Sequence, residues 1–169
     1  IIWCEGDIND IHSLEENMKD CNTLIHAAAL VSFQKSELEE LKKINIEGTA
    51  NVMNMALSYN YKRCIYISSV STLGRDSQNK EVNEESYFRS NKNISNYAFS
   101  KFYAEQEAWR VSNEGLNVII LNPSIILGPG NWDKGSSKIF QRIYNGLKFY
   151  STGSSGYVDV YDVAKITLL

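Results

Sequence analysis

Residues 63–71 read Arg-Cys-Ile-Tyr-Ile-Ser-Ser-Val-Ser. The run is apolar through its middle, which is typical of a central strand in a parallel sheet. The serines follow where the strand ends, and doubly wound folds bind ligands at that edge. A serine there can donate a hydrogen bond to a carbonyl or a developing alkoxide, although serines also satisfy backbone groups at strand ends. We therefore predict a strand over 63–68 and a candidate site residue at Ser69.

Short apolar runs alternate with longer amphipathic stretches on both sides of this strand, and that alternation is typical of a parallel sheet covered by helices. We predict further strands over 1–4, 22–28, 117–121 and 158–160, and helices over 10–19, 37–59, 97–112, 136–147 and from 161 onward. The polar, aperiodic segment 75–93 predicts a surface loop. The pattern indicates an α/β fold with a doubly wound parallel sheet, in a single domain over 1–169.

The chain has 169 residues, of which 43% are hydrophobic, and a formal net charge of -3. This composition is sufficient for one domain with a substantial core. The mild acidity argues against a nucleic acid or an anionic membrane as partner, and no apolar run approaches the roughly 18 residues of a membrane span. The cysteines, Cys4, Cys21 and Cys64, are odd in number and lack zinc-ligand spacing, so we expect a reducing, cytoplasmic location and no metal. Cys4 and Cys64 fall in runs predicted to be buried strands.

The sharpest local motif is Tyr97-Ala98-Phe99-Ser100-Lys101. Helical positions four apart share a face, so Tyr97 and Lys101 should project together. An ammonium beside a phenol favours the phenolate and lowers its pKa, and such a tyrosine can exchange a proton with a substrate oxygen. The alternative is a half-buried tyrosine beside a surface lysine.

Two further stretches are candidates for a ligand site. In 26–29, His-Ala-Ala-Ala, the small residues would let an extended ligand lie against the backbone, and we interpret His26 as an orienting or core histidine. In 45–49, Asn-Ile-Glu-Gly-Thr, the glycine lies inside a predicted helix and indicates close helix packing, because it costs about 1 kcal/mol relative to alanine. Asn45 could hold a water or a backbone group near the site, or lie exposed.

The order of these motifs resembles the extended short-chain dehydrogenase/reductase superfamily, in its NAD-dependent epimerase/dehydratase group. The matching pieces run along the whole chain: Gly6-Asp7-Ile8, His26-Ala-Ala, Asn45-x-x-Gly48-Thr49, Tyr66-Ile-Ser-Ser69, Tyr97-x-x-x-Lys101, Asn122-Pro123-Ser124, Gly128-Pro-Gly130 and Val158-Asp159-Val160-x-Asp162-Val163-Ala164. The resemblance implies a Rossmann-like, dinucleotide-binding catalytic domain with NAD or NADP as cofactor.

The resemblance also implies residue roles. Tyr97 would be the general acid/base, and Lys101 would bind the nicotinamide ribose and lower the pKa of Tyr97. Ser69 would polarise the substrate oxygen, and Asn45 would support the site and the cofactor. The remaining residues implied to contact the cofactor are Asp7 and Ile8 at the adenine, Ala27, Ala28 and Ala29 along the ribose and phosphate path, Ser68, and Pro123 and Ser124 at the carboxamide.

One family feature is missing from residues 1–169, because they contain no Gly-x-Gly-x-x-Gly loop to bind the pyrophosphate at a helix N-terminus. We expect Ile1 to belong to the family's third strand and the chain to be an excerpt of a longer protein. The N-terminal Gly-rich unit and the C-terminal substrate region would lie outside it. The residue that selects NAD or NADP would lie outside it too.

Within the superfamily, residues 26–33 and 122–124 are more similar to the dihydroflavonol-reductase and 3β-hydroxysteroid-dehydrogenase branch. We expect an NAD(P)-dependent oxidoreductase that transfers a hydride between the nicotinamide and a carbonyl or alcohol substrate. The alternatives are a nucleotide-sugar epimerase or dehydratase and a non-catalytic dinucleotide-binding module. A homodimer is possible through the helices that carry Asn45 and Tyr97, where Phe99, Phe102, Tyr103 and Trp109 supply apolar surface.

Overall fold

The computed structural model describes residues 1–74, 82–86, 88, 94–132, 135–149 and 153–169. The chain forms two compact units, Ile1–Asn122 and Pro123–Leu169. Of the predicted surface loop over 75–93, most lies outside the described residues, and its described part, 82–86 and 88, contains no helix or strand.

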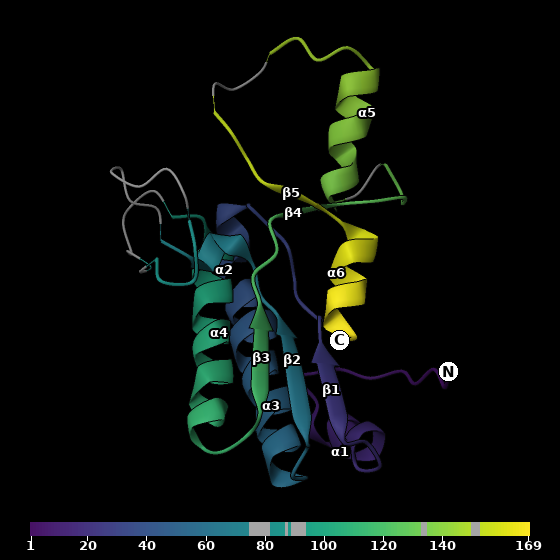
Figure 1. Cartoon of the computed structure of the whole chain (residues 1–169), viewed down its shortest axis with the longest axis vertical. Coiled ribbons are helices and arrows are strands. Elements are labelled where there is room, and N and C mark those ends of the chain that lie inside the picture. The colour runs from purple at the N-terminus through teal and green to yellow at the C-terminus, as the bar shows by residue number, and fades with distance from the viewer. Residues whose placement is uncertain (75–81, 87, 89–93, 133–134, 150–152) are drawn as a thin grey trace. The chain divides into compact units, whose positions relative to one another are not determined.

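The first unit is built on a parallel sheet of three strands in the order β1-β2-β3 (Figure 1). The strands are β1 (Thr23–His26), β2 (Arg63–Ile67) and β3 (Val118–Leu121). All three were predicted from the sequence, each slightly longer than observed. Because the strands are parallel, their carboxyl ends lie at one edge of the sheet, and that edge carries the residues that follow β1, β2 and β3.

The helices of this unit lie before β1 or between consecutive strands. They are α1 (Ile11–Met18), η1 (Lys35–Glu37), α2 (Leu38–Leu41), η2 (Lys42–Glu47), α3 (Gly48–Ser58), η3 (Val70–Thr72) and α4 (Asn96–Asn113). In place of one predicted helix over 37–59, the structure has the consecutive segments α2, η2 and α3. The six residues of η2 form a π-helix. Such π segments are rare and occur frequently at functional sites.

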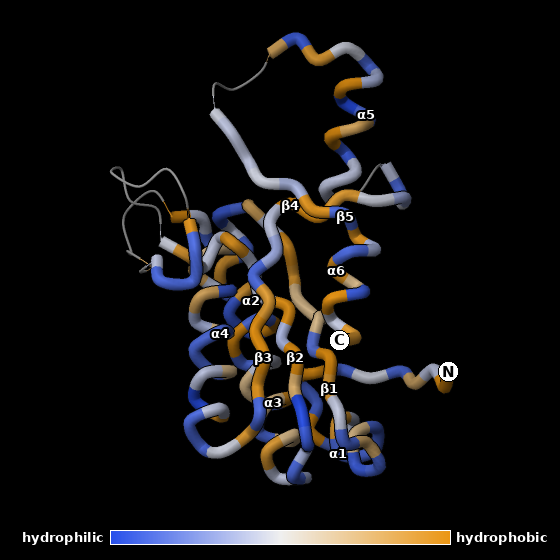
Figure 2. Tube along the Cα trace, in the orientation of Figure 1, coloured by the Kyte–Doolittle hydropathy of each residue, from blue (hydrophilic) through white to orange (hydrophobic). Residues whose placement is uncertain are grey.

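The core lies between one face of the sheet and the helices α1, α3 and α4. Leu24, Cys64, Tyr66 and Val118 point to this face and pack with residues of α3 and α4, such as Met53. The apolar strands are visible as orange segments in Figure 2. On the opposite face, Ile25 is 44% exposed and Ile119 is 41% exposed, so the helices of this unit pack on the other face of the sheet.

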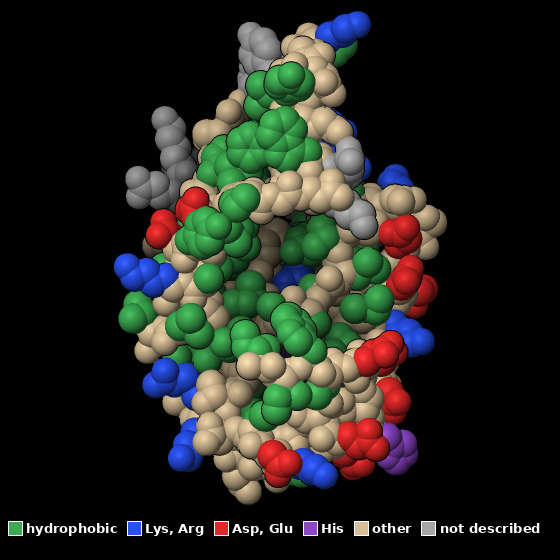
Figure 3. Space-filling model, turned by 90° about the vertical axis from the view of Figure 1, so that its right-hand side faces the viewer, with side chains coloured by type: hydrophobic (Ala, Val, Ile, Leu, Met, Phe, Trp, Pro, Cys, Tyr) green, Lys and Arg blue, Asp and Glu red, His purple; other side chains and the backbone are tan. Residues whose placement is uncertain are grey.

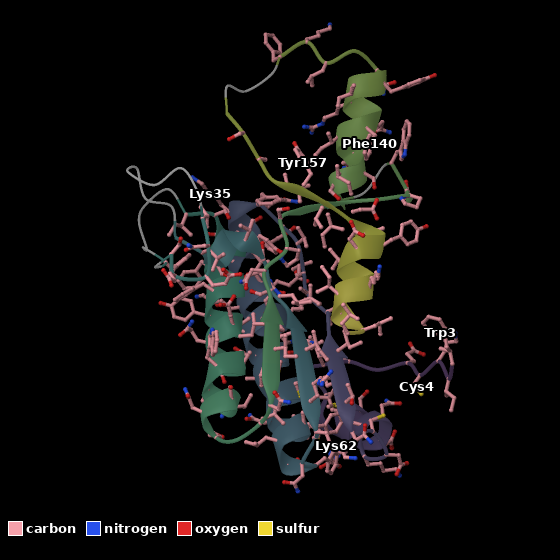
Figure 4. All side chains as sticks on the ribbon, in the orientation of Figure 1. Trp3, Cys4, Lys35, Lys62, Phe140 and Tyr157 are labelled. Carbon is pink, nitrogen blue, oxygen red and sulfur yellow. The ribbon has the colours of Figure 1, made fainter. Side chains whose placement is uncertain are left out.

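The predicted strand over 1–4 is wrong, because these residues form no strand. A strand needs a neighbour to accept and donate its backbone hydrogen bonds, and no described residue pairs with this segment. Trp3 and Cys4 lie on an extended segment that leaves the sheet (Figure 4). The predicted burial of Cys4 is therefore wrong as well, whereas Cys64 is buried as predicted. Burial raises the pKa of the Cys64 thiol to about 11, which leaves it an inert apolar residue.

Gly48 marks a close approach, as predicted from its place inside a helix. A Cβ atom at this position would lie 2.5 Å from Cδ1 of Ile8. Ile8 is also held through its backbone, since Asn51 Nδ2 donates to its carbonyl oxygen at 3.2 Å. The glycine thus lets the segment that precedes α1 pack directly on α3.

The second unit contains a two-stranded parallel sheet of β4 (Ile125–Leu127) and β5 (Tyr157–Asp159). Its helices are η4 (Gly135–Ser137), α5 (Lys138–Tyr144) and α6 (Val160–Thr167). The strand near 158–160 and both helices were predicted, but β4 was not. Asp159 caps α6, because its side chain accepts from the backbone N–H of Tyr161 at 2.7 Å.

Hydrophobic side chains reach the surface of both units (Figure 3). In the second unit, Trp132 is 46% exposed and Phe140 is 38% exposed, and their rings lie 6.2 Å apart. The parallel strands and flanking helices of the two units confirm the predicted α/β class.

Candidate active site

The serines that follow β2 occupy different environments. Ser68 is buried, and Ser69 is half-buried in an extended conformation. The hydroxyl oxygen of Ser69 accepts from the backbone N–H of Ser71 at 3.2 Å and from its hydroxyl at 2.9 Å. These two bonds use lone pairs, so the single proton of the Ser69 hydroxyl stays available for donation.

Tyr97 lies in the first turn of α4, which begins after Ser95. The Ser95 hydroxyl accepts from the backbone N–H of Ala98 at 3.1 Å and caps the helix. Burial raises the pKa of Tyr97, and the neighbouring Ser69 side chain partly opposes that rise. The structure thus brings two of the predicted catalytic side chains close together.

Lys101 follows one helical turn later and is 2% exposed. Its ammonium donates to the hydroxyl of Tyr66 at 2.8 Å and to the carbonyl of Ile67 at 2.9 Å. Burial lowers the pKa of Lys101 to about 8, and the charge of Glu105 partly opposes this. The sequence predicted that Lys101 would lower the pKa of Tyr97, but the ammonium is directed to β2, and the pKa of Tyr97 lies above its ordinary value.

The hydroxyl of Tyr66 belongs to a buried chain of polar groups. It accepts from the ammonium of Lys101, and its pKa is raised chiefly by burial, a rise that Thr49 of α3 partly opposes. His26 stacks on the Tyr66 ring with the centroids 5.5 Å apart, and its Nε2 lies 2.9 Å from the Thr49 hydroxyl. His26 is 3% exposed, which confirms its interpretation as a core histidine. Burial, aided by the charge of Lys101, lowers its pKa to about 4.

His26 should make the stability of the protein depend on pH. Its folded-state pKa of about 4 lies below its ordinary 6.5, so the unfolded chain binds more protons between these values. The stability that neutral His26 contributes is present above pH 6.5 and is lost as the pH falls toward 4. Between pH 7 and pH 5 the wild type should lose about 2 kcal/mol more unfolding free energy than His26→Gln.

Urea denaturation at the two pH values measures this difference. His12→Gln is the matched control, because His12 is exposed on α1, and it should follow the wild type. If wild type and His26→Gln lose the same free energy on acidification, the histidine is charged or accessible in the folded protein and the prediction is wrong.

Asn45 lies in η2 and is 1% exposed. Its Oδ1 accepts from the backbone N–H of Leu30 at 2.7 Å, and its Nδ2 donates to the Leu30 carbonyl at 3.0 Å. The same Nδ2 donates at 2.8 Å to the hydroxyl of Ser100, which in turn donates to the Tyr97 carbonyl at 2.9 Å. Asn45 therefore joins the segment after β1 to the backbone of Tyr97. It holds a backbone group, as predicted, and it is not an exposed residue.

The predicted cofactor-contacting residues 27–29 and Asp7 also belong to the first unit. Ala27, Ala28 and Ala29 follow β1 and are exposed, so an extended ligand could lie against their backbone. Asp7 is exposed, and its carboxylate accepts from the backbone N–H of Asn9 at 2.8 Å.

Pro123 and Ser124 belong to the second unit. A Cβ atom on Gly156 would lie 3.1 Å from Cβ of Ser124, so this glycine allows β5 to approach the residue that precedes β4. The contact of Pro123 and Ser124 with a cofactor stays a prediction.

Glu105 is the residue that sequence reasoning missed. It lies one turn beyond Lys101 on α4 and is 7% exposed, and its carboxylate accepts hydrogen bonds from Ser68 and Asn122 at 2.6 Å and 2.8 Å. The spacing of Tyr97, Lys101 and Glu105 at four-residue intervals was a signal for it, because the three share one helix face.

Among the described residues, no group of three or more His, Cys, Asp or Glu side chains could hold a metal ion. In the same part of the chain, the helices lack the combination of length and apolar character that a membrane crossing requires.

The fold and the hydroxyl–hydroxyl–ammonium arrangement define a Rossmann-like protein of the short-chain dehydrogenase type. A model of the NAD dependent epimerase/dehydratase family matches residues 1–169. The chain belongs to this family, which confirms the resemblance read from its motifs and agrees with the predicted cofactor class, NAD or NADP.

Individual relatives agree with the predicted branch. The chain is 33% identical to a putative dihydroflavonol 4-reductase of Synechocystis sp., over all of this chain and 50% of the relative. It is 29% identical to cinnamoyl-CoA reductase 1 of Petunia hybrida, over 98% of this chain and 52% of that protein. The chain thus spans about half the length of these curated relatives.

A solved structure supports the fold. A dTDP-glucose 4,6-dehydratase double mutant of Streptomyces venezuelae, crystallised with NAD, superposes with a TM-score of 0.80 over 96% of this chain and 52% of that chain. The two sequences are 22% identical, so this likeness concerns the fold alone.

Proposed function

We propose that the protein is an NAD(P)-dependent oxidoreductase that transfers a hydride between the nicotinamide and a carbonyl or alcohol carbon. The observation that carries the proposal is the placement of the Ser69 side chain beside Tyr97, where it partly opposes the rise in the pKa of the phenol. It places two hydroxyl groups together at the carboxyl end of β2, with Lys101 one turn further along the same helix. Relatives named as reductases support the same reaction class.

The residues present fit a dinucleotide. The ammonium of Lys101 has three N–H groups, and its bonds to Tyr66 and Ile67 use two of them. The third can donate to a ribose hydroxyl. The exposed alanines 27–29 offer a backbone path free of bulky side chains. When bound, the nicotinamide would supply or accept the hydride.

The chain's own groups would act on the substrate oxygen. Ser69 donates its free proton to that oxygen and fixes its position. Tyr97 donates its phenolic proton as the carbonyl becomes an alcohol, and takes a proton back in the oxidation direction. The raised pKa of Tyr97 keeps the phenol protonated at neutral pH, which suits reduction.

Other residues would contribute to cofactor binding. We assign this role to Asn45, Ser68 and the segment at Asp7 and Ile8, with Pro123 and Ser124 at the carboxamide. Asn45 would act through the backbone of Leu30, which it holds by two hydrogen bonds.

Thermal denaturation of the complete polypeptide with NAD, NADH, NADP and NADPH tests the proposal, with ATP as a control nucleotide. A ligand at a hundredfold excess over its Kd stabilises by about 2.7 kcal/mol, which raises the Tm by several degrees. We expect a rise with one oxidised and reduced pair. No rise with any of the four, from a folded sample free of bound cofactor, would contradict the proposal.

Turnover then separates the enzymatic alternatives. Stoichiometric oxidation of NADH or NADPH with simple ketones supports the proposed reductase. Conversion of nucleotide sugars without net cofactor consumption would instead indicate an epimerase or dehydratase.

A homodimer through α4 is also part of the proposal. On this helix Tyr103 is 43% exposed and Trp109 is 50% exposed, and such aromatic side chains are enriched in interfaces. Analytical ultracentrifugation of the complete polypeptide measures its oligomeric state.

A further inference from the structure

Glu105 holds the turn that carries Ser69. Its Oε2 accepts from the hydroxyl of Ser68 at 2.6 Å and from the hydroxyl of Thr72 at 2.7 Å. These two residues lie on either side of Ser69 along the chain. The carboxylate of Glu105 on α4 is therefore hydrogen-bonded to both ends of the short turn that begins after β2.

The same carboxylate also accepts a hydrogen bond from the residue that follows β3. The side-chain amide of Asn122, the residue that follows β3, donates to Oε2 at 2.8 Å and to the Thr72 hydroxyl at 2.9 Å. The carbonyl of Ser69 lies 2.9 Å from the Thr72 hydroxyl and 3.3 Å from the Asn122 amide. Thr72 has a single proton, and the carboxylate is the stronger acceptor. The Ser69 carbonyl accepts from the backbone N–H of Thr72 at 3.0 Å, and the Asn122 amide lies within reach as a second donor.

Burial makes this cluster costly to break. Among the residues that the structure describes, Glu105 is the one acidic side chain in the buried class, and Ser68 and Thr72 are 5% and 3% exposed. A buried carboxylate is tolerated when its oxygens are hydrogen-bonded, and bonds to a charged group are the strong ones. Oε2 lies within hydrogen-bond distance of donors from the turn after β2 and from the residue after β3, so it connects both segments to α4.

We infer that Glu105 is a positioning residue, which fixes the turn after β2 so that the hydroxyl of Ser69 faces Tyr97. The catalytic meaning of this role rests on the proposed function, because it assumes that Ser69 holds a substrate oxygen. The structural part of the role, a carboxylate that orders the turn, does not depend on that assumption.

Hydrogen–deuterium exchange on the complete polypeptide tests the structural part without cofactor or substrate. In Glu105→Ala, backbone amides of 69–74 should exchange roughly tenfold to a hundredfold faster than in wild type, because bonds to a buried charged group are lost. Amides of α3 serve as the internal reference and should change far less. Equal acceleration in both regions, or no acceleration of 69–74, would overturn the inference.

Glu105→Gln is the rescue variant. Its amide oxygen can take the place of Oε2 and accept from Ser68, Thr72 and Asn122, while its NH2 group faces the indole N–H of Trp109. Exchange of 69–74 should stay within a few-fold of wild type. If Glu105→Gln exchanges as fast as Glu105→Ala, accepted hydrogen bonds do not order the turn and the inference is wrong.

Two matched variants complete the design. Trp109→Phe removes the bond of 3.3 Å to the other oxygen, Oε1, and should leave 69–74 unchanged. Thr72→Val removes one donor of the turn at nearly constant volume, and should speed exchange of 69–74 by a few-fold even if Glu105→Ala fails to fold. Acceleration by Trp109→Phe, or none by Thr72→Val, would count against the role.

The catalytic part has its own readout. For a carbonyl substrate found by screening, kcat should fall at least tenfold in Glu105→Ala with the KM for cofactor within a few-fold of wild type, and Glu105→Gln should recover most of it. If kcat is unchanged in Glu105→Ala while the amides of 69–74 exchange faster, the catalytic part of the inference is wrong. If instead the proposed function is wrong, the Tyr97→Phe variant should remain active, and the exchange results for the Glu105 variants should still hold.

Discussion

Tyr97→Phe is expected to lower turnover by roughly a thousandfold, because a positioned general acid contributes about 10²–10⁴ to the rate. The change removes one hydroxyl and keeps the ring. The ring packs near Phe33, with centroids 5.8 Å apart, so the fold and the affinity for cofactor should stay close to wild type. Steady-state kinetics of the complete polypeptide with a carbonyl substrate measures the loss.

Tyr103→Phe is the matched control for this variant. Tyr103 lies on the same helix, is 43% exposed, and packs against Phe99 with ring centroids 4.5 Å apart. Removal of its hydroxyl should leave turnover unchanged. If Tyr97→Phe keeps turnover within a few-fold of wild type, the proton does not come from Tyr97 and the proposed mechanism fails.

The elements that carry the site could be predicted because their signals are local. The apolar run at 63–67 ends in serines, and this order places Ser69 at the carboxyl end of β2. The spacing of Tyr97 and Lys101 on α4 follows from the helical repeat. The alternation of apolar runs and amphipathic stretches accounts for the predicted fold, and the resemblance to the family accounts for the expected pairing of Ser69 with Tyr97.

The direction of Lys101 could not be predicted, because it depends on a residue of another element. The hydroxyl of Tyr66 and the carbonyl of Ile67 on β2 accept from the ammonium, and nothing in the pattern of α4 encodes their position. The burial of Asn45 depends in the same way on the backbone of Leu30, 15 residues away in sequence. The hydrogen bonds of the cluster at Glu105 join residues up to 53 positions apart.

The predicted strand over 1–4 failed for a similar reason. An apolar run of four residues fits a strand by composition, but a strand exists through its neighbours. In the described part of the chain none pairs with Ile1–Cys4, and Trp3 is 90% exposed.

Lys101→Met should have two opposite effects. Activity should fall by roughly 10²–10³, the loss typical of removing one preorganised charged donor from a site. Stability should rise, because the ammonium is 2% exposed and its pKa is lowered from 10.5 to about 8. That shift corresponds to about 3 kcal/mol of unfavourable burial at neutral pH. Loss of the two bonds to Tyr66 and Ile67 offsets about 2 kcal/mol, so a net gain of about 1 kcal/mol is expected.

The dependence of stability on pH distinguishes removal of a buried charge from better packing of the methionine as the cause of the gain. Because the folded pKa of Lys101 is lower than the unfolded one, the unfolded chain binds more protons between about pH 8 and 10.5. The free energy of unfolding of the wild type should therefore rise relative to that of Lys101→Met as the pH increases through this range. The difference in stability between the two proteins should narrow. The other titratable groups near the ammonium are Glu105 from α4, Tyr66 from β2 and His26 from β1, and both proteins retain them.

Urea denaturation at pH 7 and pH 10 measures the narrowing, with Lys62→Met as control because Lys62 is exposed just before β2. The control should match wild type in stability at both pH values and in turnover. A Lys101→Met variant that is less stable than wild type at pH 7 would mean that the ammonium stabilises the fold, and a fully active one would remove Lys101 from the site. A protein that gains stability while losing turnover is the result expected of a charge kept buried for chemistry rather than for folding.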